Sequence, residues 1–186
     1  MAKLIYSVIS SLDGYVADEN GGFDWAAPDE ELHTFVNDME RPIGTYLLGR
    51  KMYDLMAVWE TMDLAPEPDC IKDFAQMWRA ADKIVYSTSL KSVDTRQTRI
   101  ERKFEAAAIR DMKAGAKRDI SIAGPNLAAQ AMQAGLIDEW NFYLVPVVVG
   151  KGKRALPESV RLNLELIGHH RFAAGAVHLQ YRTAAD

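Results

Sequence analysis

The sequence predicts a single α/β domain over residues 1–186, with a largely parallel sheet and antiparallel strands at one edge. Two observations predict this class. Runs of β-branched and aromatic residues alternate with helical patterns through most of the chain, and three β-type runs follow one another at its end. The length and the 48% apolar content are those of a domain that can bury one core. No linker or internal repeat divides the chain.

Each element follows from a local signal. A strand over residues 3–10 stops at the turn dipeptide Asp13-Gly14. A loop over residues 14–24 precedes a helix that Pro28 opens, where apolar residues recur at i, i+3, i+4 and i+7. The same signals predict strands over 45–48, 82–87, 120–123, 139–149, 162–170 and 176–182, and helices over about 51–59, 104–116 and 126–134. Alternating charges favour an exposed helix through residues 96–118.

Composition excludes several function classes. The formal net charge of -4 does not favour nucleic acid or an anionic membrane as a partner, and no apolar run reaches the length of a membrane span. The single cysteine, Cys70, excludes an intramolecular disulfide. Three histidines on the last two strands have no cysteine partner, so no metal site is expected. We expect a cytoplasmic protein.

Two junctions between a strand and a helix carry the functional signal. At the first, Gly49 lets the backbone approach a ligand, and Arg50, Lys51 and Met52 open the helix that follows. The helix dipole disfavours cations there, which points to a bound anion. A plain turn with two solvated cations is an equally weighted interpretation.

The second junction is Gly124-Pro125-Asn126-Leu127, where the amides of Asn126 and Leu127 would face a pyrophosphate. Pro125 presets the first helical φ but removes one amide donor. Two such junctions in one small chain favour a dinucleotide, because open α/β sheets bind ligands beyond the carboxyl ends of their strands. Ser87, Thr88 and Ser89 end another strand, where they either hold a phosphate or only form a turn.

These residues resemble a known family. The segment 47–53 is similar to the part of dihydrofolate reductases that binds the 2′-phosphate end of NADPH. Ser11-Leu12-Asp13-Gly14, the segment 124–139, Val145-Pro146 and Gly150-Lys151-Gly152 resemble the reductase domain of the bacterial bifunctional riboflavin biosynthesis deaminase/reductase. The resemblance runs in the right order over nearly the whole chain. It implies the dihydrofolate reductase-like three-layer fold, a twisted sheet of about eight strands, NADPH as hydride donor and a homodimer.

The resemblance also implies roles for single residues. Arg50, Lys51, Ser87 and Thr88 would surround the adenosine phosphates, and residues 124–127 the pyrophosphate. Val16, with the 14–24 loop, would cover the nicotinamide. Ile9, Trp25, Phe35 and Val145 would contact the substrate.

Two carboxylates are candidate catalytic residues. Glu31 takes the place of the family's substrate carboxylate if one residue is inserted, and it flanks the apolar stripe one turn before Phe35. A carboxylate there would pair with the N–C–NH₂ edge of a pterin or aminopyrimidine. Asp13 would contact substrate at the mouth of the site. A solvated acid at Glu31 and a turn-closing acid at Asp13 are the alternatives.

Charge favours one class of substrate over another. Residues 24–40 contain six acids and no Lys or Arg, which would repel a ribose phosphate. We therefore expect an NADPH-dependent reductase of a neutral or cationic pteridine or pyrimidine-type heterocycle. A phosphoribosylamino-pyrimidine held by Lys151, Lys153 and Arg154 stays open. The alternative of another class is a non-catalytic nucleotide- or heterocycle-binding module on the same fold.

Overall fold

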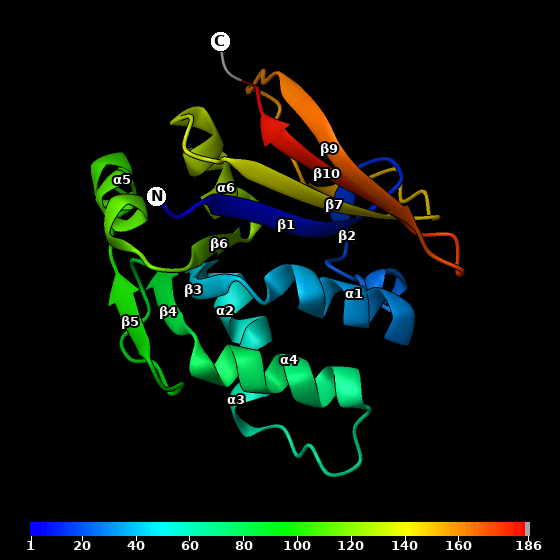
Figure 1. Ribbon diagram of the computed structural model, residues 1–186, viewed down its shortest axis with the longest axis horizontal. Helices are drawn as coiled ribbons and strands as arrows, with labels where there is room; N and C mark the ends of the chain where they lie inside the picture. The colour runs from blue at the N-terminus through cyan, green and yellow to red at the C-terminus, as the bar shows by residue number, and fades with distance from the viewer. Residues whose placement is uncertain (185–186) are drawn as a thin grey trace.

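The computed structural model describes residues 1–184 and has a mixed sheet of eight strands, in the order β5-β4-β3-β6-β1-β7-β10-β9 (Figure 1). The pairs from β5 to β7 are parallel, and β10 pairs antiparallel with both β7 and β9. The strands of this sheet are β1 (Leu4–Ser11), β3 (Ile43–Gly49), β4 (Asp82–Tyr86), β5 (Thr98–Glu101), β6 (Asp119–Ala123), β7 (Glu139–Val145), β9 (Leu164–Arg171) and β10 (Val177–Thr183).

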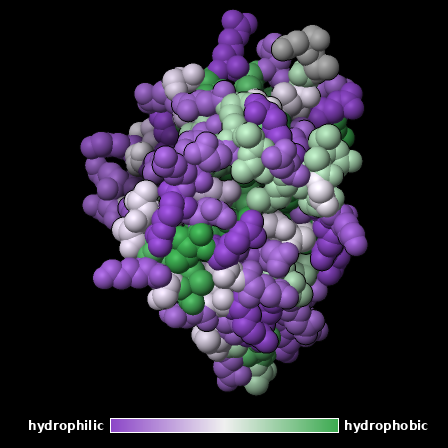
Figure 2. Space-filling view, turned by 90° about the vertical axis from the view of Figure 1, so that its left-hand side faces the viewer, coloured by the Kyte–Doolittle hydropathy of each residue, from purple (hydrophilic) through white to green (hydrophobic). Residues whose placement is uncertain are grey.

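Helices cover both faces of the sheet, which confirms the predicted three-layer architecture (Figure 1). One face carries α5 (Ala106–Gly115) and α6 (Pro125–Gln133). The other carries α1 (Glu30–Glu40), α2 (Arg50–Met56), α3 (Val58–Thr61) and α4 (Asp69–Ala80). Hydrophilic side chains cover most of the side on which α5 and β5 lie, and apolar residues form only small patches there (Figure 2).

The core is divided by the sheet into apolar clusters. On the side of α5 and α6, the buried strand residues Leu4, Leu47 and Ile120 pack with Ile109 and Leu127 of the helices. On the opposite side, β3 and β4 pack against α2 and α4, and the end of β7 packs against α1. The buried tryptophans Trp78 and Trp140 belong to these clusters, as expected of large aromatic side chains.

Three short strands were not expected. Residues 98–101 form β5 and not part of a helix, so the prediction of one exposed helix over 96–118 is wrong for its first part. The predicted 14–24 loop contains β2 (Tyr15–Asp18), which pairs antiparallel with β8 (Gly152–Arg154), and the 3-10 helix η1 (Asp24–Ala26). The second sheet, β2-β8, joins segments more than 130 residues apart in sequence.

Candidate functional site

The two glycine junctions lie side by side at the carboxyl ends of adjacent strands. β3 and β6 pair in parallel up to Leu48 and Ala123, so Gly49 and Gly124 leave the sheet together. Gly124 has φ +94°, a conformation that strains any residue with a side chain. A Cβ at Gly124 would lie 3.8 Å from the Gly49 amide nitrogen and 3.5 Å from the Met52 Cβ. Both distances are ordinary van der Waals contacts, so it is the positive φ that favours glycine at this position.

One cavity of about 940 Å³ opens at this point. Its size is near the upper end of the range of about 300–1,000 Å³ found for ligand pockets, which suits a large ligand such as a dinucleotide. Its walls come from both junctions, from the β2 segment and from the β8 segment. The lining residues are Val16–Gly21, Phe23, Gly49, Arg50, Lys51, Met52, Leu55, Gly124, Pro125, Asn126, Leu127 and Lys151–Lys153.

The start of α6 offers fewer amide donors than the sequence suggests. Pro125 has no N–H, and the amides of Leu127 and Ala128 both donate to the Gly124 carbonyl, at 3.1 and 3.0 Å. The prediction that the amides of both Asn126 and Leu127 face an anion is therefore wrong for Leu127, because its amide already donates to the Gly124 carbonyl. The Asn126 amide, the helix dipole of α6 and the Lys153 ammonium, which donates to Asn126 Oδ1, provide the positive potential at this junction.

The cations of the first junction face the same cavity. The Arg50 Nε donates to both carboxylate oxygens of Asp54 at 2.8 Å, which orients the guanidinium while its other nitrogens keep their donors. Lys51 lines the cavity beside it. On the opposite wall, the Lys151 ammonium lies 3.0 Å from Glu19. Arg50 and Lys51 are therefore the cations next to Gly49, and Lys153 is the cation next to the Gly124 junction.

A second cavity of about 540 Å³ adjoins the first through Arg50. It brings the predicted residues Ser87, Thr88 and Ser89 together with Arg50, whereas Lys51 lines the main cavity instead. It also contains residues that the sequence analysis did not single out, from the segment between β5 and α5. The full lining is Arg50, Tyr86, Ser87, Thr88, Ser89, Arg102, Lys103, Phe104, Glu105 and Gln130.

Arg102 shapes the second cavity. Its Nη1 donates to the Ser87 carbonyl at 2.9 Å and to the Leu90 carbonyl at 2.7 Å. The Ser87 hydroxyl accepts the amides of Ser89 and Leu90, so this side chain forms the turn. Thr88 and Ser89 are exposed at its tip. Because β5 was mistaken for a helix, the position of Arg102 opposite this turn was missed.

The outer wall of the main cavity consists of the β2-β8 ribbon. Val16 lies on this wall, as expected of a residue that covers a bound ring. Gly152 packs so closely that an added Cβ would fall 2.0 Å from the Ala17 carbonyl oxygen. Asp13 holds the base of the ribbon by accepting the Val149 and Gly150 amides, at 3.0 and 2.7 Å.

Asp13 is an unsuitable proton donor. Hydrogen bonds from the Ser11 hydroxyl and then from the Val149 amide lower the pKa of Asp13 to about 2, so it is ionised at neutral pH. Both carboxylate oxygens are used in contacts with the chain itself. The structure therefore favours the turn-forming interpretation of this residue over a role in proton transfer.

The predicted substrate contacts come together, but away from the open cavity. Ile9, Trp25, Phe35 and Val145 belong to one apolar cluster beneath α1, and Phe35 packs edge-on against Tyr143 at 6.4 Å between ring centroids. None of the four lines the main cavity. The indole nitrogen of Trp25 is buried without a partner among the described residues. Ile9, Trp25 and Phe35 are only partly buried, and their contact with substrate stays a prediction.

Glu31 lies at the other end of this cluster. Its carboxylate accepts the Ala173 amide at 2.9 Å, in the turn between β9 and β10, and its side chain is exposed. Asp29 caps α1 by accepting the Leu32 amide at 2.8 Å, as its position suggested. Glu31 does not line the main cavity, so its pairing with a heterocycle stays a prediction.

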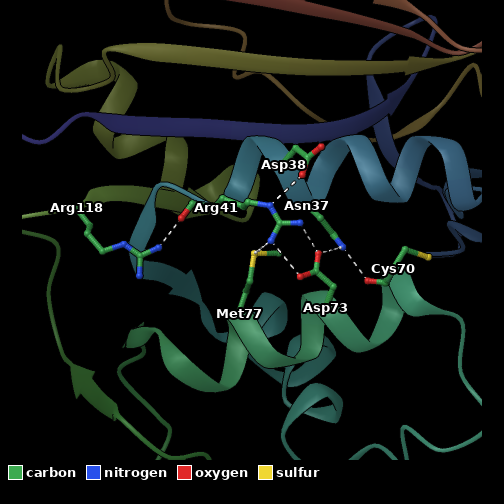
Figure 3. A network of polar contacts seen from close by, with 7 residues as sticks. All are labelled: Asn37, Asp38, Arg41, Cys70, Asp73, Met77 and Arg118. Carbon is green, nitrogen blue, oxygen red and sulfur yellow. Dashed lines mark hydrogen bonds and ion pairs between the residues drawn. The ribbon is translucent and has the colours of Figure 1, made fainter.

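A polar network holds α1 against α4 (Figure 3). The Arg41 guanidinium donates to both carboxylate oxygens of Asp73, at 3.1 and 2.9 Å. The buried Asn37 amide donates to the same carboxylate and to the Cys70 carbonyl. This network fixes the helix that carries Glu31 and Phe35, and so fixes that side of the site.

Neither a metal centre nor a membrane span is found in the part of the chain that the structure describes. No group of three His, Cys, Asp or Glu residues within 1–184 is arranged to hold an ion. No helix in that range is long and apolar enough to cross a bilayer.

Comparison with known proteins matches this arrangement to one family. The model of the RibD C-terminal domain matches residues 2–178. The uncharacterized protein YyaP of Bacillus subtilis is 26% identical over 181 residues, which cover 96% of this chain and 94% of YyaP. A putative riboflavin biosynthesis protein from Shewanella superposes with a TM-score of 0.75 at 21% identity, with full coverage of both chains. RibD of Acinetobacter baumannii superposes with a TM-score of 0.74 at 14% identity, over 99% of this chain and 58% of that one. The chain belongs to the RibD C-terminal domain family and has its dihydrofolate reductase-like fold.

Proposed function

We propose that the protein is an NADPH-dependent reductase of a pteridine or pyrimidine-type heterocycle. One observation carries the proposal: Gly49 and Gly124 lie side by side, and the helix starts behind them line one cavity of a size that suits a dinucleotide. The family is one of NADPH-dependent reductases, and a superposed structure from Thermotoga maritima is described as a deaminase/5-amino-6-(5-phosphoribosylamino)uracil reductase. At 14% identity, that likeness concerns the fold.

The residues present fit the cofactor. The pyrophosphate would lie over Gly124 and the Asn126 amide, where a side chain on residue 124 would obstruct it, with Lys51 and Lys153 as counter-charges. The adenosine 2′-phosphate would enter the second cavity, where Arg50, Arg102 and Lys103 face exposed hydroxyls. The nicotinamide would lie under Val16 and the β2-β8 ribbon.

The protein's share of the reaction is to orient two rings and to exclude water, because the bound cofactor supplies the hydride. The β2-β8 ribbon provides a wall on one side, and the first residues of α2 and α6 provide the other. Glu31 remains the proposed partner of the heterocycle's amidine-like edge, and this role requires its contact with Ala173 to open. Asp13 is not proposed as a donor, since its pKa is about 2.

Catalysis and simple binding are distinguished by two measurements. Quenching of tryptophan fluorescence by NADPH is expected to saturate below the millimolar range, and loss of 340 nm absorbance is expected with dihydropterins or the phosphoribosylamino-pyrimidine. Binding without turnover of any heterocycle would support the alternative, a non-catalytic nucleotide-binding module. Absence of saturable NADPH binding would remove both proposals.

We also propose a homodimer. The edge strand β9 exposes Leu166 and Ile167, at 49% and 41% of their surface, and an exposed apolar edge invites pairing. Light scattering after size-exclusion chromatography is expected to give a mass twice that of one chain. Leu166→Lys is expected to shift the measured mass toward that of a single chain. A monomeric parent protein would exclude this.

A further inference from the structure

We propose that the outer part of the main cavity is a subsite for an uncharged, apolar substituent of the heterocyclic substrate, formed by Phe23 and Leu55. This inference rests on the proposed function and names the class of substrate that the site takes. It excludes a phosphorylated sugar as the preferred substituent.

The first support is the exposure of two large apolar side chains inside a cavity. Phe23 is 44% exposed and Leu55 is 51% exposed, and both line the main cavity. They come from different elements, because Phe23 precedes η1 and Leu55 lies on α2, one turn after Lys51. Isolated exposed apolar residues are common on surfaces, but apolar residues that share a concave site rimmed by polar groups mark a ligand surface.

The second support is the distribution of cations in the same cavity. Arg50, Lys51 and Lys153 lie at the glycine junctions, where the proposed dinucleotide places its own phosphates. Two lysines of the outer wall line the cavity, and both have partners: the Lys151 ammonium lies 3.0 Å from Glu19, and the Lys153 ammonium donates to Asn126 Oδ1. A phosphorylated substituent would therefore compete with the cofactor or break an ion pair.

The third support is the acidic character of the surrounding chain. No Lys or Arg occurs between Lys3 and Arg41, a stretch with nine Asp and Glu residues. Asp18 and Glu19 of this stretch line the cavity next to Phe23. A phosphate dianion beside them would be repelled, whereas an alkyl or aryl group would gain by leaving water. The charges and the apolar pair thus select the same class of substituent.

The test measures binding to the NADP⁺ complex, so it does not depend on turnover. The probes are 7,8-dihydropterin, the same ring with a 6-propyl group, and 5-amino-6-(5-phosphoribosylamino)uracil, each followed by its fluorescence or by calorimetry. We expect the propyl compound to bind at least about tenfold more tightly than the unsubstituted ring, and the phosphoribosyl compound to bind most weakly.

The variants are Leu55→Ser and Phe23→Ser, with Leu12→Ser as a matched control. Leu12 is 64% exposed and lies outside the cavity. Leu55→Ser and Phe23→Ser are expected to abolish most of the tenfold advantage of the propyl group, while the unsubstituted ring and NADP⁺ keep their affinity. Leu12→Ser is expected to change none of these affinities.

Two results would overturn the subsite. One is tightest binding by the phosphoribosyl compound, and the other is an equal effect of Leu55→Ser on all three compounds. If NADP⁺ itself does not bind, the proposed function fails. The subsite is then tested separately, by comparing how tightly the cofactor-free protein binds the propyl compound and the unsubstituted ring.

Discussion

Gly124 lies beside Gly49, where the paired strands β3 and β6 end, and the proposal of a dinucleotide site starts from this proximity. A Cβ at Gly124 would stand 3.8 Å from the Gly49 amide nitrogen, in the space through which a pyrophosphate would reach the start of α6. This proximity joins two loops separated by 75 residues of sequence, and neither loop alone would define a dinucleotide site.

Gly124→Ala is expected to weaken NADPH binding by tenfold or more and to lower the free energy of unfolding by about 1–2 kcal/mol, because φ +94° strains alanine. Tryptophan quenching and urea unfolding measure the two effects. The control is Gly135→Ala, which also has a positive φ but has no neighbour within 4 Å of an added Cβ and lies outside both cavities. Gly135→Ala should lower the free energy of unfolding and leave the affinity for NADPH unchanged. Equal loss of cofactor affinity in both variants would contradict a local role of Gly124.

Arg102→Ala is expected to raise the Kd for NADPH by about tenfold or more, and that for NADH much less, since charged hydrogen bonds to a phosphate contribute about 1.5–3 kcal/mol. Lys103→Ala and Arg50→Ala should also raise the Kd for NADPH more than that for NADH. Lys103→Ala should do so without disturbing the turn at Ser87, which Arg102 holds. Arg110→Ala, an exposed cation on α5, is the control. An unchanged NADPH to NADH ratio in all three variants would place the 2′-phosphate elsewhere.

Asp73→Asn is expected to lower the free energy of unfolding by about 1 kcal/mol, because the ion pair with Arg41 is partly exposed and therefore screened. Hydrogen bonds from Arg41 hold the pKa of Asp73 below its usual value. The stabilisation is therefore present above the pKa of the unfolded chain, near 3.8, and is lost as pH falls through the lower folded value. Urea unfolding at pH 7 and pH 3 should show a difference between parent and variant that shrinks in acid. Asp38→Asn, whose side chain is 64% exposed, should have a smaller effect.

Glu40→Gln is expected to change how stability depends on pH. Burial raises the pKa of Glu40 to about 7, although Ser7 and Tyr46 beside it oppose the shift. Because the folded state holds this proton up to a higher pH than the unfolded chain, the parent should lose roughly 2–3 kcal/mol as pH rises from about 4.5 to above 7. The variant should lack this loss. Unfolding at pH 5 and pH 8 measures it, and Glu30→Gln on the exposed start of α1 is the control. Parallel profiles in parent and Glu40→Gln would show that the carboxyl is charged in the fold.

The glycine junctions could be predicted because their signals are local. A strand, a glycine and a helix start follow one another within a few residues at both Gly49 and Gly124, and pairing of β3 with β6 then brings them together. The resemblance to a known family supported these predictions, because the signals follow one another along the chain in the order typical of that family. The structure contains both strand–glycine–helix junctions and the fold that the resemblance implies.

The remaining parts of the site depend on pairing between distant segments. β5 carries alternating charges that suit a helix, and only its pairing with β4 makes it a strand that places Arg102 opposite Ser87. Similarly, β2 is a strand only because β8 lies beside it. Ile9, Trp25, Phe35 and Val145 share one cluster, but sequence could not show that this cluster lies outside the lining of the main cavity.

The ribbon of β2 and β8 has a further consequence for ligand entry. Two-stranded sheets are marginally stable in water, and this one forms no ladder with the eight-stranded sheet behind it. Its amides should therefore exchange with solvent deuterium sooner than those of β1 or β6, through openings that leave the core folded. Opening of the ribbon would remove one wall of the cavity and expose a bound dinucleotide to solvent, so it would shorten the lifetime of the complex.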